Sequence, residues 1–379
     1  MIEFYNRWDV FLDENRYFTV SIMEVSNLIN SGSNLFDIAD IFKYSETALY
    51  LYLQGYIVLV ANYFDHASIL TLKLFNVYIA ALIPTVLFYL LTYVVNKREA
   101  FYGSFIYGLL SFNFAYSSPL LRDGLGAFLY ILIFYYYLLP TSNKNLFFIF
   151  LISILSYYLR PETGMFAFLI AFSYLYFRFD KLFKSKILLK LIVISILLPL
   201  SIFLLIRFNS VDIMTSLAGR YGDNALGQAS SDSLGSALLK LPLYIRLPLK
   251  FIQGQITYFP PWSVLAGDVS FIRLPEAIAS ISWPYVWPLI LVGIIKEKLL
   301  LILDKKIIML FLLSVGYIFI SGSVATNPRQ LMYVYPVIFL VAIVSFLKLS
   351  IYRRKQIIFL FFIIYLSLIA LYLFLKYLR

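Results

Sequence analysis

Long apolar runs, separated by short clusters of charged residues, make up most of the chain. The runs are roughly 17–25 residues long, which is the length that an α-helix needs to cross a bilayer. The pattern therefore predicts an all-α membrane protein of about 10–11 transmembrane helices. Ten spans are expected at 69–95, 101–118, 124–140, 146–159, 163–179, 187–206, 277–295, 307–325, 331–348 and 357–375.

Segment 47–64 leaves the exact number of spans open. It could be an eleventh span, or equally a helix that lies on the membrane surface. If it spans, residues 1–46 are cytoplasmic; if it lies flat, they are external, and their acidic character favours this second arrangement. Segment 14–30 has helical spacing and ends at the turn-forming "NSGSN". Residues 1–68 are thus expected to form an acidic amphipathic segment, external or interfacial.

Basic residues occupy every second connection between the predicted spans. They are Lys97, Arg98, Lys144, Arg178, Lys181, Lys184, Lys186, Lys296, Lys298, Lys305, Lys306, Arg353, Arg354 and Lys355. Lysine and arginine are enriched in cytoplasmic loops of membrane proteins, so these connections are predicted to be cytoplasmic. The spans then form a first bundle at 69–206 and a second bundle at 277–379.

Each remaining connection carries an arginine and is predicted to be external. These connections hold Arg122 with Asp123, Arg160 with Glu162, the long segment 207–276, and the "TNPRQ" turn at 326–330. Charges beside apolar helices are costly in a membrane, so they are usually paired and often functional. Arg122 could pair with Asp123 or Glu162 only to hold helix ends together. Four arginine-bearing connections on one side favour instead a site for an anionic ligand.

The segment 207–276 is expected to be one long external loop. Its stretch 220–236 is polar and rich in glycine and serine, as mobile loops are. Stretch 241–264 combines prolines with aromatic residues, which predicts a membrane-surface or re-entrant element with Tyr258 and Trp262 at interface depth. Such a loop suits a substrate that is part lipid and part polar, although a plain structural lid is the alternative.

Composition agrees with the membrane class and excludes several chemistries. Hydrophobic residues make up 62% of the chain and charged residues 13%, against about 25% charged in soluble domains. The net charge of +11 is explained by basic cytoplasmic loops, so no nucleic-acid partner is inferred. The chain has no cysteine and a single histidine, His66, which excludes disulfides, Cys–Zn sites and iron–sulfur clusters.

Several short elements resemble bacterial membrane glycosyltransferases that assemble surface polysaccharides. "LDENRYF" (12–18) looks like the acidic first external loop of GT-C type enzymes. "LLRDGLGAFLYILIFYYYLL" followed by "LSYYLRPETGMFAFLI" is similar to paired elements of Wzy-type O-antigen and capsule polymerases. "NPRQLMYVYPVIFLVAI" (327–343) is similar to their late span, in which an arginine precedes a proline. The resemblance implies a GT-C-like fold, a bacterial inner-membrane location, and transfer of polyprenyl-(pyro)phosphate-linked sugars on the external face.

Glycosyl transfer from such a carrier requires a phosphate site and a base. Arginine binds phosphate oxygens in a planar fork and stays charged, so the predicted phosphate ligands are Arg122, Arg160, Arg220 and Arg329, with Arg246 behind them. A carboxylate takes the proton of the acceptor hydroxyl, and Asp13 or Glu14 is predicted in this role. Asp123 and Glu162 are expected to orient the arginines, with Asp123 holding Arg122.

The expected partners are the polyprenyl-linked donor, a glycan acceptor, membrane lipid and, as an open point, a chain-length regulator. No cofactor is predicted with certainty, and the first loop has no D-x-D motif that would support a divalent metal. The alternative function is a flippase for lipid-linked oligosaccharides. Transporters are expected to have internal repeats and charges near the middle of the spans, whereas the charges here lie at span ends.

Overall fold

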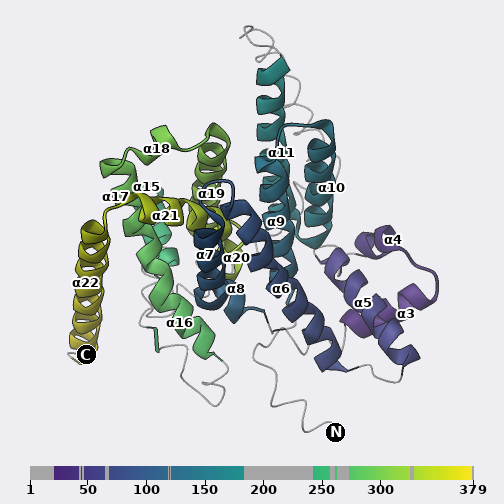
Figure 1. Cartoon of the computed structure of the whole chain (residues 1–379). Coiled ribbons are helices and arrows are strands. Elements are labelled where there is room, and N and C mark those ends of the chain that lie inside the picture. Colours follow the sequence, from purple (N-terminus) through teal and green to yellow (C-terminus); the bar gives the residue numbers. More distant parts are fainter. Residues whose placement is uncertain are drawn as a thin grey trace.

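The structure is a computed structural model that describes residues 21–41, 44, 47–64, 68–117, 119, 121–182, 242–256, 261–262, 273–324 and 328–377. All regular secondary structure in these ranges is helical, and no sheet occurs in them (Figure 1). The all-α prediction is thereby confirmed for the described part of the chain.

Three helices precede the predicted spans and pack together at one edge of the molecule (Figure 1). They are α3 (Met23–Asn30), α4 (Leu35–Asp40) and α5 (Ala48–Tyr63). The predicted "NSGSN" turn ends α3, since Gly32 adopts a φ of 100° and Asn34 caps α4 in a box with Asp37. Helix α5 matches segment 47–64, and its 16 residues pack against α3, α6 and α10.

Helices occupy most of the described part of the range predicted for the first bundle. Its helices are α6 (Ile69–Leu91), α7 (Lys97–Leu110), α8 (Phe112–Ala115), α9 (Asp123–Leu138), α10 (Asn143–Leu159) and α11 (Pro161–Leu182). Ser111 adopts an extended conformation and divides the expected span 101–118 into α7 and α8. The expected span 187–206 lies outside the described residues.

The second bundle contains more breaks than the hydropathy pattern predicts. Its elements are α15 (Leu243–Gln255), α16 (Leu274–Ser282), η3 (Trp283–Tyr285), α17 (Val286–Lys296), α18 (Leu299–Ile302), α19 (Lys305–Val324), α20 (Pro328–Leu331), α21 (Tyr335–Lys348) and α22 (Ile351–Tyr377). The expected span 331–348 is broken by a turn between α20 and α21. Helix α22 stands at the outer edge, far from α3–α5 (Figure 1).

Three stretches of helix are long and apolar enough to cross a membrane by length and composition: Ile69–Leu91, Leu274–Lys296 and Ile351–Phe374. Helices α9, α10 and α21 are apolar but shorter, at 16, 17 and 14 residues. Helix α21 lies in the interior, and most of its residues from Tyr335 to Ser345 are buried. A chain with several such helices has the character of a membrane protein.

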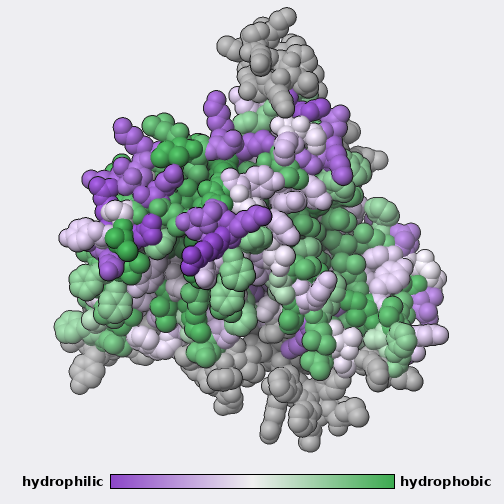
Figure 2. Space-filling model, viewed as in Figure 1, coloured by the Kyte–Doolittle hydropathy of each residue, from purple (hydrophilic) through white to green (hydrophobic). Residues whose placement is uncertain are grey.

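Several contacts join connections that are predicted to be cytoplasmic. Lys306, in the first turn of α19, donates hydrogen bonds to the carbonyls of Tyr137 and Leu139 at the end of α9. Arg353 pairs with Glu297, which joins the connection at 349–356 to the one at 296–306. Figure 2 shows hydrophilic side chains along the upper rim of the molecule, above a broad hydrophobic band. Connections predicted to share the cytoplasmic side therefore meet each other.

Candidate anion-binding site

Asn76 positions the chain that leads into α9. Its side-chain amide nitrogen donates to the carbonyls of Pro119 at 2.7 Å and Leu121 at 3.2 Å. The same group lies 3.1 Å from the Tyr50 hydroxyl, and the amide of Gln54 donates to Asn76 at 3.2 Å. All three polar side chains are buried. Helices α5 and α6 thus fix the connection from which Arg122 and Asp123 project.

Asp123 is the first residue of α9 and the centre of the charged cluster. Its Oδ2 accepts hydrogen bonds from Nε and Nη2 of Arg329 at 3.0 and 2.9 Å. Its Oδ1 accepts a hydrogen bond of 2.9 Å from the hydroxyl of Tyr333. A carboxylate at a helix N-terminus also interacts favourably with the helix dipole. The carboxylate is almost completely buried, so these partners replace the water it has lost.

Arg160 reaches the same carboxylate from the turn between α10 and α11. It is extended, with φ −165° and ψ 109°, as favoured for a residue before a proline, and Pro161 begins α11. Its Nη1 lies 3.7 Å from Oδ1 of Asp123, and its Nε donates to Glu162. The two helices approach each other closely after this turn: a Cβ on Gly164 would lie 2.3 Å from Cα of Tyr157. Glycine at 164 therefore permits the close packing of α10 on α11.

Arg329 and Tyr333 come from the break before α21. Arg329 lies on α20, and Tyr333 lies in the turn that separates α20 from α21. The ring of Tyr333 stacks on that of Tyr130, with centroids 5.5 Å apart, and passes directly over Gly126. A Cβ on Gly126 would lie 2.5 Å from Cε1 of Tyr333. Gly126, the second glycine of "RDGLG", is thus required for Tyr333 to reach Asp123.

The cluster combines three arginines with two carboxylates, which leaves one net positive charge from Arg122, Arg160, Arg329, Asp123 and Glu162. The side chains of Arg329 and Glu162 are 19% and 28% exposed, against 6% and 2% for Arg160 and Asp123. The cluster is therefore open to solvent at Arg329 and Glu162 and closed around Asp123. A small anion would meet the positive charge from the open side.

The carboxyl groups of Asp123 and Glu162 lie just before the predicted spans 124–140 and 163–179, respectively. Burial alone would raise the pKa of Asp123, but Arg329, Arg160 and Arg122 outweigh it and hold that pKa below its usual value. Burial also raises the pKa of Glu162, but the charges of Arg160 and Arg122 outweigh it, so the pKa of Glu162 lies below its usual value. The two groups stay ionised at neutral pH, so they serve as counter-ions rather than as proton donors.

The structure brings together Arg122, Arg160, Arg329, Asp123 and Glu162, as the common-side prediction requires. The expectation that Asp123 holds Arg122 stays a prediction, and the structure adds hydrogen bonds to Asp123 from Arg329 and Tyr333. Arg122 acts on Asp123 through its charge. Glu162 does contact Arg160, as expected. Asp13, Glu14 and Arg220 lie outside the described residues. Arg246 lies on α15, and only its backbone is described.

Sequence reasoning missed a second ion pair at the start of α16. Nε and Nη2 of Arg273 donate to Oε2 of Glu276 at 3.0 and 2.6 Å. Glu276 is 2% exposed and interacts electrostatically with Arg329. The signal was present in "RLPEAIAS", where an arginine and a carboxylate flank a proline just before an apolar run, much as in "LRPETG". The pair was overlooked because it falls at the end of the long polar segment.

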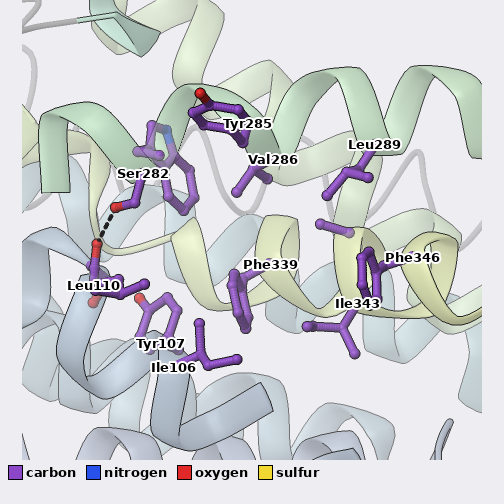
Figure 3. A pocket seen from close by; sticks show the side chains of 13 residues that line it. Ile106, Tyr107, Leu110, Ser282, Tyr285, Val286, Leu289, Phe339, Ile343 and Phe346 are labelled. Atoms are coloured by element: carbon purple, nitrogen blue, oxygen red, sulfur yellow. Dashed lines mark hydrogen bonds between the residues drawn. The ribbon is translucent and has the colours of Figure 1, made fainter. Parts of the chain in front are cut away.

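An apolar groove lies further along the same helical stretch. It has a volume of about 210 Å³ and is bounded by α7, by α16 and α17, and by α21. Tyr107, Val286 and Phe339 are among its lining residues, and Figure 3 shows their side chains directed into it. Ser282 closes one end by donating a hydrogen bond of 2.7 Å to the carbonyl of Leu110 (Figure 3). The groove suits a hydrocarbon chain better than a polar ligand.

No protein-family model, curated protein or solved structure matches this chain. Within the described ranges, no group of three histidine, cysteine or acidic side chains is placed to hold a metal ion. The resemblance to polysaccharide enzymes therefore stays a prediction.

Proposed function

We propose that the protein is an integral membrane glycosyltransferase or polymerase that uses polyprenyl-(pyro)phosphate-linked sugars to build a surface polysaccharide. The proposal includes a GT-C-like arrangement of 10–11 spans in the bacterial inner membrane, with the reaction on the external face. One observation carries it: Arg122, Arg160 and Arg329 come from three separate connections and meet around Asp123.

The cluster has the chemistry needed to hold a phosphate leaving group. Arginine donates to phosphate oxygens in a fork and remains charged at every physiological pH. Asp123 holds Arg329 and Glu162 holds Arg160, so the guanidinium groups are fixed before a ligand arrives. Such fixed positive groups stabilise the charge that develops on phosphate when the glycosidic bond breaks.

The apolar groove supplies the second half of a lipid-phosphate site. Glu276, which interacts with Arg329, and Ser282, which borders the groove, lie six residues apart on α16. At 1.5 Å per residue this separation is about 9 Å along the helix axis. A phosphate at the arginines and an isoprenoid chain in the groove would thus lie beside one helix. Arg220 and Arg246 remain predicted phosphate ligands, and Asp13 and Glu14 remain predicted bases.

The proposal is tested in the organism that carries the gene. Arg122→Ala is expected to abolish the long-chain ladder of the surface polysaccharide while the protein still inserts and folds. Arg353→Ala is the matched control, since it removes an ion-paired arginine at the opposite end of the helices, where an exposed pair contributes about 0–1 kcal/mol. A normal ladder with Arg122→Ala would contradict the site.

A flippase is distinguished from a transferase by where its substrate accumulates. Deletion of a transferase or polymerase leaves single lipid-linked units on the external leaflet. Deletion of a flippase leaves them on the cytoplasmic leaflet. Chemical labelling of the saccharide in intact cells reports the leaflet, and labelled units only after permeabilisation would favour the flippase.

A further inference from the structure

We propose that Glu276 is the general base of this site and accepts the proton of the sugar acceptor. This role rests on the proposed glycosyl transfer and adds a catalytic residue to it. The predicted bases Asp13 and Glu14 belong to a segment outside the described residues, whereas Glu276 is placed by the fold itself.

Glu276 lies at the same end of the molecule as the arginine cluster. It is in the first turn of α16, and its charge interacts with that of Arg329. Seven residues later, the ring of Trp283 stacks on that of Tyr335 with centroids 3.8 Å apart. Tyr335 follows the turn from which Tyr333 bonds Asp123. Through Trp283 of η3, the chain that continues α16 therefore packs on the start of α21, beside the break that presents Arg329.

One oxygen of Glu276 is available for chemistry. Both hydrogen bonds from Arg273 end on Oε2. Among the hydrogen bonds of the described residues, none ends on Oε1. Arg273 thus orients the carboxylate and leaves Oε1 to accept a proton.

The proposed step balances as a simple displacement. The acceptor hydroxyl oxygen forms a bond to the anomeric carbon of the donor sugar, and its proton moves to Oε1 of Glu276. The bond from the anomeric carbon to the phosphate oxygen breaks, and its electron pair leaves with the (pyro)phosphate. Arg122, Arg160 and Arg329 carry the charge of that leaving group. The proton on Glu276 then returns to water.

Kinetics of the full-length protein in detergent test the role, with lipid-linked saccharide extracted from the deletion strain as donor and acceptor. A positioned base contributes typically 10²–10⁴-fold to a rate. Glu276→Gln is therefore expected to lower kcat at least about 100-fold with KM nearly unchanged. Glu276→Asp should recover part of kcat, because it restores a carboxylate. Arg273→Gln, the control, keeps the carboxylate and should lower kcat much less.

The possible outcomes distinguish a wrong assignment of Glu276 as base from a wrong assignment of glycosyl transfer. A wild-type protein that does not elongate the saccharide overturns both. An active wild type with kcat unchanged in Glu276→Gln, or with equal losses in Arg273→Gln and Glu276→Gln, overturns the base alone. If thermal unfolding measurements show that the Glu276→Gln variant is not folded, the Glu276→Asp variant is used for the test. Its displaced carboxylate must then lower kcat at constant KM, and an unchanged kcat overturns the assignment.

Discussion

Asp123 and Arg329 are 206 residues apart in the chain, yet two nitrogens of the guanidinium donate to one carboxylate oxygen at 3.0 and 2.9 Å. The pair ties the first bundle to the second, because Asp123 opens α9 and Arg329 lies before α21. Arg160 shares the same carboxylate at 3.7 Å. The charge that orders the arginine cluster is therefore also a link between the two halves of the fold.

Asp123→Asn is expected to destabilise the protein more than Arg329→Gln. Loss of the carboxylate leaves two arginines without their shared counter-ion, and breaking a buried pair from one side costs about 3–5 kcal/mol. Arg329→Gln leaves Asp123 with Arg160 and Tyr333. The double variant should lose less stability than the sum of the single variants, with a coupling of about 0.5–3 kcal/mol. Thermal unfolding in detergent measures all three, and strict additivity would show that the contact is not formed.

Gly126→Ala is expected to displace Tyr333 from Asp123. The new Cβ would lie 2.5 Å from Cε1 of Tyr333, and overpacking of this kind costs about 1–3 kcal/mol. Gly124→Ala is the matched control in the same helix, since its Cβ would lie 3.9 Å from the nearest atom. Alanine at 124 should be neutral or slightly stabilising, because it favours the helix. Equal melting temperatures for both variants would contradict the close approach.

The convergence of arginines could be predicted from sequence because it follows from topology. In the predicted topology, alternating spans place every second connection on one side, so Arg122, Arg160 and Arg329 are expected to share a side. Their individual partners could not be predicted, since hydropathy carries no information on which helices are neighbours. Adjacency in the sequence points from Asp123 to Arg122, and it gives no sign that Asp123 also accepts hydrogen bonds from Arg329 in the second bundle.

Breaks in helices were also invisible to the hydropathy pattern. The turn between α20 and α21 consists of Met332, Tyr333 and Val334, which are as apolar as the helix around them. Here buried packing and the proline at 336 set the conformation, not exposure to water. Glu276 was missed for a related reason: its burial depends on how α16 packs, which no local pattern records.

Asn76→Ala is expected to loosen the connection that carries Arg122 and Asp123. The variant removes the hydrogen bonds to the carbonyls of Pro119 and Leu121, and leaving buried groups without partners costs about 1–3 kcal/mol. Asn113→Ala is the control, because this buried asparagine makes a long 3.4 Å bond to Tyr107 and no other side-chain hydrogen bond to the described residues. A lower melting temperature and faster proteolysis within 117–122 are expected for Asn76→Ala alone. Equal behaviour of both variants would refute a special role of Asn76.

Cysteine labelling should place α3–α5 on the external side. Their contacts favour it: Tyr50 and Gln54 of α5 join Asn76, which holds the Arg122 connection, and Phe36 of α4 packs edge-on against Tyr158 beside Arg160, with centroids 5.7 Å apart. The chain has no native cysteine, so single variants give a clean signal.

Ser31→Cys, at the exposed end of α3, is expected to react with a membrane-impermeant maleimide in intact cells or spheroplasts. Ser350→Cys, in the exposed connection before α22, is expected to react only after the membrane is opened. Both should react fully in detergent, which controls for burial. Protection of Ser31→Cys in spheroplasts would place α3–α5 in the cytoplasm. Residues 1–20 would then need another crossing to bring Asp13 and Glu14 near the arginines, and Glu276 would be left as the carboxylate positioned for base catalysis.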